Sequence, residues 1–336
     1  MLKNRTGDYG MNDDIMVSIY CMAYNHEKYI RQTFEGFLKQ NTGFKYEVIV
    51  HDDASTDKTA EIIREYEGKY PDVFKAIYQK ENQYSKGIKV FDTFIAPVIK
   101  GRYVAVCEGD DFWTDAEKLK LQVEFLEKHQ DYSACVHQTV LFDCRTRKKR
   151  LLSSYDRDRD VDIRTIISGG GKAYHLSSLM FRREYAENRP DFYYLEKHID
   201  DYPLGIFLAM KGKIFFMNRT MSYYRQFSVV SSWSSDIGGN EAKLILTNKN
   251  LIAMLKGADE YSKYKYHKYI DSACSHFEYE IKRLNKDKAI IKNERYKRWF
   301  KRESIVNKLY ILARLYVPEK MFNTVRHIMR KDNEGR

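Results

Sequence analysis

The sequence predicts an α/β protein built on a largely parallel β-sheet, and two observations support this prediction. Three short apolar runs rich in β-formers, at residues 17–23, 46–50 and 103–107, each lead directly into polar or acidic residues. Stretches with helical periodicity separate these runs, as in repeated strand–helix–strand units. In open sheets of this kind, ligands bind outside the carboxyl ends of the strands. We therefore expect the functional site beside the polar residues that follow the three runs.

Elements alternate regularly in the first half of the chain. Apolar runs predict the strands, and apolar residues at three- and four-residue spacing predict the helices between them. Candidate N-caps and prolines mark several helix ends; Pro71, for example, follows the second helix. The predicted elements are strands at 17–23, 46–50, 73–79 and 103–107, helices at 28–40, 59–70, 91–100 and 116–129, and a loop at 81–87.

Shorter elements follow in the second half. A strand is predicted at 132–142, and the highly charged stretch 144–162 is expected to be irregular and to pass over the mouth of the site. Pro203 suits the first turn of a helix, where its missing N–H would have no partner. The remaining predicted elements are strands at 175–182, 214–217 and 221–225 and a helix at 198–210, with helical spacing from about residue 240 onward.

Length and composition describe a globular protein with one large core or two smaller ones. The chain has 336 residues, of which 43% are hydrophobic and 14% aromatic. We expect a flexible N-terminus at residues 1–14, an α/β domain at 15–238 and a basic helical region at 239–330. Five scattered cysteines, none of them in a CxxC pair, fit a reducing compartment and argue against a zinc site.

Neither a membrane span nor a secretion signal is predicted. No apolar run approaches the roughly 20 residues that cross a bilayer. Residues 1–14 are polar and contain no apolar signal-peptide core. We therefore expect a cytoplasmic protein.

The net charge of +11 lies entirely in the last part of the chain. Residues 241–336 contain 23 Lys and Arg against 12 Asp and Glu, and residues 1–240 are balanced. Basic helices most often pack on their own domain while their charges are solvated. The sharper interpretation is peripheral contact of residues 261–330 with the anionic inner face of the cell membrane. Nucleic-acid binding is disfavoured, because no reader motif accompanies the charge.

Three carboxylates within four positions follow the central strand: Glu108, Asp110 and Asp111. Like charges this close raise one another's pKa unless a cation or a donating ligand lies between them. Mg²⁺ typically binds one or two carboxylates together with substrate phosphates, so a divalent metal site is one interpretation. The other is a solvated acidic turn that caps the following helix. Spacing alone does not separate the two.

In combination, four segments resemble the family 2 glycosyltransferases, whose fold is called GT-A, over roughly residues 15–235. They are residues 22–25, 48–59, 108–113 and 201–204, each at the end of a predicted strand or the start of a helix. The resemblance implies a Rossmann-like mixed sheet flanked by helices, here with a C-terminal helical extension. It also implies that residues 15–238 form a GT-A glycosyltransferase domain.

The activity implied by the resemblance is a metal-dependent, inverting transfer of a sugar from a nucleotide donor. The donor would be a UDP-sugar, the metal Mn²⁺ or Mg²⁺, and the acceptor a saccharide or a lipid-linked molecule in surface polysaccharide assembly. On the donor side, Tyr24 would stack near the nucleotide base. Asp53 would accept hydrogen bonds from the base, with Asp52 beside it.

For the acidic turn, the resemblance implies metal and donor contacts. Asp110 would ligate the metal together with Glu108, which stands where the family usually has Asp and contacts the ribose. Asp111 would support the metal or contact the sugar. Asp201 matches the catalytic base, with Asp200 as a second candidate; the alternative for both is an N-terminal helix cap. The acceptor side would include Ser177, Ser178, Trp113 and Arg225.

The chemistry of sugar transfer agrees with these roles. A leaving diphosphate develops negative charge that a carboxylate-bound metal stabilises, and an acceptor hydroxyl needs a positioned base. Two other functions remain open. A sugar-phosphate nucleotidyltransferase usually has a Gly-rich, basic loop after the first strand, and residues 24–27 have none. A non-catalytic binding protein would use the basic helices as an interaction platform.

Overall fold

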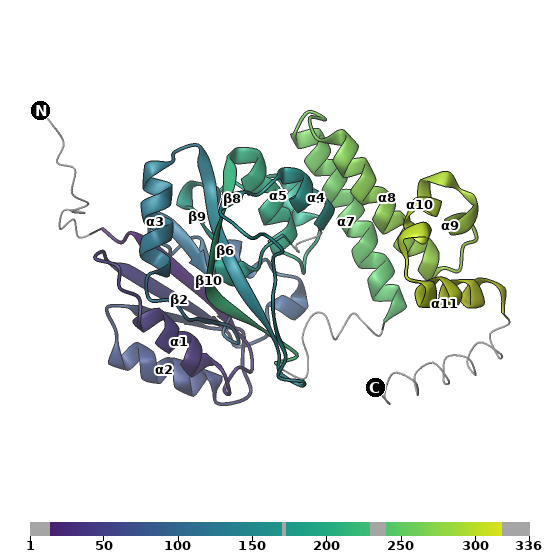
Figure 1. The fold of residues 1–336 in the computed structure, drawn as a ribbon. Coiled ribbons are helices and arrows are strands. Elements are labelled where there is room, and N and C mark those ends of the chain that lie inside the picture. The colour runs from purple at the N-terminus through teal and green to yellow at the C-terminus, as the bar shows by residue number, and fades with distance from the viewer. Residues whose placement is uncertain (1–13, 170–172, 229–239, 318–336) are drawn as a thin grey trace, which may run out of the picture. The chain divides into compact units, whose positions relative to one another are not determined.

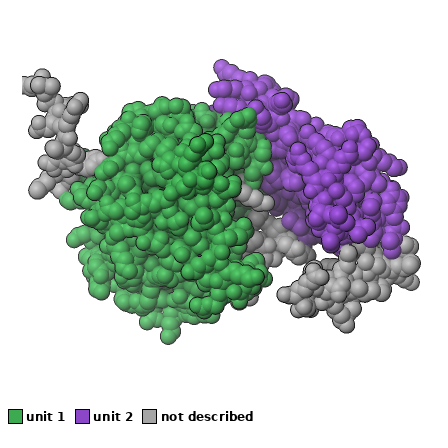
Figure 2. Space-filling model, viewed as in Figure 1, with its two compact units in different colours: residues 1–233 green, residues 234–336 purple. Residues whose placement is uncertain are grey.

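A computed structural model describes residues 14–169, 173–228 and 240–317 of the chain (Figure 1). The chain divides into two compact units, residues 1–233 and 234–336 (Figure 2). Most of the expected flexible N-terminus lies outside the described residues. So do the expected domain boundary at residue 238 and residues 318–330 of the basic region.

A mixed ten-stranded sheet forms the first unit. Its main path has the order β3-β2-β1-β4-β9-β6-β10-β5. The first four strands of this path are mutually parallel, as predicted. They are β1 (Val17–Ala23), β2 (Tyr46–Asp52), β3 (Phe74–Tyr78) and β4 (Tyr103–Val106).

The other half of the sheet contains both strand directions. Strand β9 runs antiparallel to both of its neighbours, β4 and β6, whereas β10 runs parallel to β6. Strand β5 closes the path antiparallel to β10. These strands are β5 (Phe112–Trp113), β6 (Tyr132–Asp143), β9 (Met180–Arg182) and β10 (Lys213–Gln226).

Helices flank the sheet, which confirms the predicted mixed sheet with helical layers (Figure 1). The α-helices are α1 (Ile30–Leu38), α2 (Thr59–Lys69), α3 (Lys118–Lys128), α4 (Ile163–Gly169) and α5 (Asp201–Lys211). The shorter turns are η1 (Tyr84–Lys86), η2 (Phe91–Ile95), η3 (Leu176–Ser178), η4 (Arg183–Tyr185) and η5 (Asp191–Tyr194).

Aromatic packing fixes α1 and α2 against the parallel strands. Phe34 of α1 is fully buried, and its ring centroid lies 5.0 Å from that of Tyr66 and 4.9 Å from that of Phe74. Truncating a buried Phe to Ala typically costs about 3–5 kcal/mol. The ends of the parallel strands are therefore held by a rigid core, and the side chains that follow them have defined positions.

Four of the predicted segments were wrong in detail. Residues 176–178 form the 3-10 turn η3 and not a strand, because the His175 side chain accepts a hydrogen bond from the Ser177 N–H and starts a turn. Two predicted strands are one strand, β10, whose exposed residues 218–220 coincide with register shifts and interrupt the apolar pattern. The stretch 144–162 is not wholly irregular, since it contains β7 (Lys149–Leu151) and β8 (Arg159–Asp160).

The second unit consists of helices in its described part, as predicted for the C-terminal region. Helices α7 and α8 pack side by side, and Tyr279, Ile290 and Ile311 form a small buried cluster. No helix of the described residues has both the length and the apolar character needed to cross a bilayer. The helices are α7 (Glu241–Tyr261), α8 (His267–Leu284), α9 (Ala289–Lys292), α10 (Glu294–Arg302) and α11 (Ile305–Tyr316).

Candidate active site

Two turns lock together where the parallel strands β1 and β2 end. The Thr56 N–H donates to Asn25 Oδ1 at 2.8 Å, and the His26 N–H donates to Thr59 Oγ1 at 2.7 Å. Tyr24 lies at the start of the first turn and is 38% exposed, so its ring is available for stacking. The polar residues after the two strands therefore form one rigid wall of the site.

The turn after β4 packs directly on this wall. Its Gly109 N–H donates to the Met22 carbonyl at 2.9 Å, and the Asp111 N–H closes the turn on the Glu108 carbonyl at 3.0 Å. A Cβ at Gly109 would lie 2.7 Å from His26 Nδ1, closer than real Cβ contacts. The close approach of the two turns thus requires glycine between the acids.

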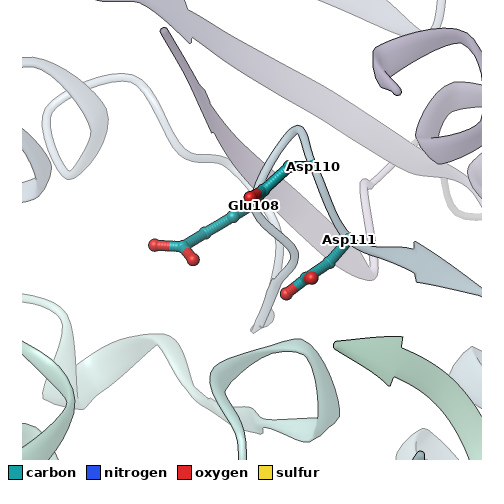
Figure 3. A group of neighbouring side chains, drawn as sticks. All are labelled: Glu108, Asp110 and Asp111. Atoms are coloured by element: carbon teal, nitrogen blue, oxygen red, sulfur yellow. The ribbon is translucent and has the colours of Figure 1, made fainter. Parts of the chain in front are cut away.

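The three carboxylates of this turn converge. One ligand atom from each of Glu108, Asp110 and Asp111 lies within 4.8 Å of the others, and Figure 3 shows the three side chains leaving the same turn. Burial, followed by the charge of Asp110, raises the pKa of Asp111 well above its usual range. Asp111 Oδ2 is buried and has no hydrogen-bond partner among the described residues. Clustered oxygen ligands with an unsatisfied carboxylate oxygen fit a hard divalent cation.

Glu108 connects this cluster electrostatically to the start of α5. Burial, followed by the negative charges of Asp110, Asp201 and Asp200, raises the pKa of Glu108 to about 8. Burial lowers the pKa of His26, and the negative charges of Asp110 and Asp52 act in the opposite direction. The structure therefore brings the acids predicted from three separate segments into one electrostatic neighbourhood.

Arg225 holds the acidic turn in place. Its backbone N–H donates to Asp111 Oδ1 at 2.9 Å. Its guanidinium donates to the Asp110 carbonyl and to Gln32 Oε1, and it stacks on the Phe112 ring at 4.3 Å. Arg225 was predicted on the acceptor side, but its donors are committed to the turn. We correct its role to that of a support for the carboxylate cluster.

The other three residues predicted on the acceptor side are buried. Ser177 and Ser178 are fully buried and Trp113 is 3% exposed. The Trp113 Nε1–H donates to the Ser177 carbonyl at 2.8 Å, and the Ser178 hydroxyl donates to the His175 carbonyl at 2.6 Å. These side chains do not line an open face in this structure, because their polar atoms are satisfied internally. Their buried side chains pack beneath the site, and we do not assign them a direct contact with the acceptor.

A stacked pair that the sequence did not single out lies beside the acids. The rings of His175 and Tyr224 stack at 4.0 Å. Burial raises the pKa of Tyr224, and the charges of Asp111, Glu108, Asp110 and Asp201 raise it further. Burial also lowers the pKa of His175 to about 4, so the imidazole is neutral. No motif marks either residue, and only the fold shows that they belong to the site.

Asp200 and Asp201 have different partners at the start of α5. Asp200 Oδ1 lies 2.6 Å from Lys89 Nζ and accepts from the Tyr193 hydroxyl at 3.2 Å. Asp201 Oδ1 accepts from the Tyr202 N–H at 2.8 Å, and no ion pair of the described residues engages it. Burial raises the pKa of Asp201 to about 6. Asp201 therefore differs from Asp200 in having no lysine counter-ion among the described residues.

The two acids at the carboxyl end of β2 are enclosed by the protein. Both Asp52 and Asp53 are buried. Asp53 accepts from the Gln83 N–H at 2.7 Å and from the Tyr84 N–H at 3.1 Å, so both of its oxygens hold the following loop. Burial raises the pKa of Asp52, and its Oδ1 has no hydrogen-bond partner in the described part of the chain. Contacts of these acids with a nucleotide base stay a prediction.

Comparisons with known proteins agree with the predicted fold and identify the family. A model of the family described as glycosyl transferase family 2 matches residues 18–209, more than half of the chain. An uncharacterized protein of Mycobacterium tuberculosis is 34% identical over 217 residues, which cover 62% of this chain and 58% of the length of that relative. The Escherichia coli UDP-Glc:alpha-D-GlcNAc-diphosphoundecaprenol beta-1,3-glucosyltransferase WfaP is 26% identical over 248 residues, which cover 70% of this chain and 85% of WfaP.

The fold also resembles a solved structure. The crystal structure of residues 1–349 of S. aureus TarS in complex with UDP-GlcNAc superposes with a TM-score of 0.58 at 16% sequence identity. The alignment covers 91% of this chain and 82% of that one. At this level of identity the similarity shows the fold, and it confirms the predicted GT-A architecture.

Proposed function

The chain belongs to glycosyltransferase family 2, and from this premise we propose that it transfers a sugar, with inversion, from a nucleotide donor to a hydroxyl of a saccharide or lipid-linked acceptor. Membership of the family makes the protein a glycosyltransferase and removes the nucleotidyltransferase and the non-catalytic binding protein as alternatives. One observation supports the finer proposal: the carboxylates of the β4–β5 turn and Asp201, an acid without an ion-pair partner among the described residues, lie in one electrostatic neighbourhood.

The carboxylate cluster supports binding of Mn²⁺ or Mg²⁺. Glu108, Asp110 and Asp111 would hold the ion, which would act as a Lewis acid toward the leaving diphosphate. Arg225 keeps the turn in its conformation through the Asp110 carbonyl and the Asp111 carboxylate. Tyr24, on the wall formed by the ends of β1 and β2, offers a face on which the nucleotide base would stack.

Asp201 supports the role of base. A general base works best when its pKa lies near the operating pH, and burial raises the pKa of Asp201 to about 6. Its carboxylate would take the proton of the acceptor hydroxyl as that oxygen attacks the anomeric carbon. The bond from this carbon to the diphosphate breaks on the opposite side. A single displacement of this kind inverts the anomeric configuration and needs no enzyme nucleophile.

The relatives suggest the donor and the acceptor. The name of WfaP specifies UDP-Glc and an acceptor carried on diphosphoundecaprenol, and the TarS crystal contains UDP-GlcNAc. We therefore propose a UDP-sugar donor and an acceptor attached to a lipid diphosphate. Such an acceptor would place the reaction in surface polysaccharide assembly.

The proposed reaction is tested with the purified chain, Mn²⁺, a panel of UDP-sugars and a lipid-diphosphate saccharide. We expect Asp201→Asn to reduce transfer by roughly 10²–10⁴-fold, the range that general bases contribute, while donor affinity stays near that of the parent. Asp191→Asn, which changes an exposed acid of η5, is the matched control and should transfer at the parent rate. Transfer by Asp201→Asn at the parent rate would refute the base assignment. Failure of the parent to bind any nucleotide sugar would refute the proposed function.

A second proposal concerns the helix α11, and a specific observation supports it. Its residue Ile311 is buried in the unit, yet four large apolar side chains on other faces are exposed by more than half: Ile305, Val306, Leu309 and Tyr316. A helix face in water is normally polar. The exposed cations Lys301 and Arg302 immediately precede this helix. Apolar side chains next to cations fit the surface of an anionic bilayer.

We propose that this face of α11 docks peripherally on anionic lipid at the inner face of the membrane. In co-sedimentation with vesicles containing phosphatidylglycerol, the double variant Ile305→Glu/Leu309→Glu should bind at least about tenfold more weakly than the parent. The control Leu246→Glu changes an equally exposed leucine of α7 and should bind like the parent. Equal binding by all three proteins, or a parent that binds only neutral vesicles, would refute the docking surface.

A further inference from the structure

Lys89 is a nearly buried cation that contacts the segment just before the proposed base. Its side chain is 9% exposed, and its Nζ lies 2.6 Å from Asp200 Oδ1. The same ammonium donates to the Ile199 carbonyl at 3.2 Å and lies 4.9 Å from the centre of the Tyr193 ring. A lysine is seldom buried without a partner. These contacts therefore fix the position of Lys89, and its charge compensates that of Asp200.

The segment that carries Lys89 is anchored at both ends. Asp53 accepts from the N–H groups of Gln83 and Tyr84 at its start. The Tyr84 hydroxyl donates to the His198 carbonyl at 3.2 Å, and the two rings lie 5.2 Å apart. Residues 83–89 thus connect the end of β2 to residues 198–200. The position of Lys89 is a property of the folded site and not of a free side chain.

We propose that Lys89 is a positioning residue of the active site, which pairs with Asp200 and so leaves Asp201 as the one acid of the two that is free to take the acceptor proton. The inference rests on the proposed function and deepens it by assigning different roles to two adjacent carboxylates. Without a cation at this place, two vicinal acids would share their protons and neither would have a defined role.

The charges around the two acids support this division of roles. Electrostatic interactions connect Asp201 with Asp200 and Lys89, with Glu108 of the β4–β5 turn, and with Tyr174 and Tyr224. After burial and the Tyr202 N–H, the charge of Asp200 raises the pKa of Asp201, and the charge of Lys89 lowers it.

Asp200 itself faces a second set of groups beside Lys89. They are Tyr193, Arg189, Asp92 and Tyr20. Loss of Lys89 would therefore leave the negative charge of Asp200 acting on Asp201 without its closest counter-charge. Loss of Asp200 would instead leave the positive charge of Lys89 acting on Asp201.

The test is a set of four full-length proteins: the parent, Lys89→Met, Asp200→Asn and the double variant. The Asp201 carboxyl is titrated by NMR with carbon-13 in the aspartate side chains, and its signal is assigned by its loss in Asp201→Asn. We expect the midpoint to move up by roughly one pH unit in Lys89→Met, down in Asp200→Asn, and back near the parent value in the double variant. The acid limb of kcat/KM should move in the same directions, and Lys89→Arg should restore the parent limb.

A merely structural role would lower stability without these opposite shifts. Shifts of one sign in both single variants, or no shift in either, would overturn the proposal. So would a parent-like rate in Asp201→Asn combined with loss of transfer in Asp200→Asn. If Lys89→Met fails to fold, the direction in which Asp200→Asn moves the Asp201 midpoint still tests the proposal. The NMR titration needs no turnover, so absence of transfer by the parent would count against the proposed function, and absence of the shifts would count against the role of Lys89.

Discussion

Two groups of acids lie in the proposed active site, and the chain compensates their charges differently. At the start of α5, Asp200 has an internal counter-ion, Lys89, at 2.6 Å. In the β4–β5 turn, no Lys or Arg ion pair of the described residues reaches the carboxylates of Glu108, Asp110 or Asp111. The nearest guanidinium bonds a backbone carbonyl and a side-chain amide, and the nearest imidazole is neutral.

This difference favours the proposal that Asp200 is neutralised within the chain, whereas the acids of the turn bind an external cation. A carboxylate paired with a buried lysine is already neutralised, so it has no need of a further cation. Burial and neighbouring carboxylates raise the pKa of Glu108 and of Asp111, and a cation bound among these acids would offset their repulsion. We therefore propose the turn as the place for an external cation, and the start of α5 as the place where an internal cation distinguishes two adjacent acids.

The largest expected effect comes from changing the uncompensated group. Asp110→Asn removes one of the converging carboxylates, so Mn²⁺ should bind at least about tenfold more weakly and sugar transfer should fall by roughly 10²-fold or more. Electron paramagnetic resonance of free Mn²⁺ measures the affinity. Asp115→Asn is the control, because Asp115 lies just beyond the turn and pairs with Arg219. If both variants bound Mn²⁺ like the parent, the turn would be a solvated loop and the comparison would fail.

An intermediate effect is expected from pH, through Asp201. Because its carboxylate must be ionised to act as a base, kcat/KM should fall about tenfold per pH unit below a pH of about 6 and level off above it. Stability should change in the opposite direction. A carboxyl whose folded pKa is raised stabilises the fold below its unfolded pKa of about 4. This contribution is lost as the pH rises through 6.

The measurements that check this are a pH–rate profile of the parent and thermal unfolding of the parent and of Asp201→Asn across pH 4 to 7. The variant should lack the contribution of Asp201 to the pH dependence of stability, and Asp191→Asn should keep it. A rate that stays constant down to pH 4.5 would show that a different group accepts the proton.

The sequence predicted the strand ends and turns of the site better than the contacts of its buried side chains. Apolar runs that end in polar or acidic residues located the ends of β1, β2 and β4 and the acidic turn, because strand ends and charged turns are local features. The partner of Asp200 could not be predicted, since Lys89 precedes it by 111 residues and only the fold brings them together. The family resemblance implied that Ser177 lies on the acceptor side. Its hydroxyl instead bonds Ser222 at 3.0 Å inside the protein.

The smallest expected effect comes from Arg225, which supports the uncompensated turn without neutralising its carboxylates. Arg225→Lys keeps a positive charge but cannot reach both the Asp110 carbonyl and Gln32 Oε1. We expect the free energy of unfolding to fall by about 2 kcal/mol, the typical cost of one or two buried hydrogen bonds to a charged group. Mn²⁺ affinity should fall only severalfold, because all three carboxylates remain.

Thermal unfolding with and without Mn²⁺ measures both quantities for Arg225→Lys. Arg219→Lys, which alters an exposed ion pair with Asp115, is the control and should change stability by less than about 1 kcal/mol. If Arg225→Lys lost Mn²⁺ as completely as Asp110→Asn does, the guanidinium would be essential to the geometry of the cation site. The turn would then depend on the Arg225 guanidinium as the start of α5 depends on Lys89. The two groups of acids would differ only in whether that cation bonds a backbone carbonyl or a carboxylate.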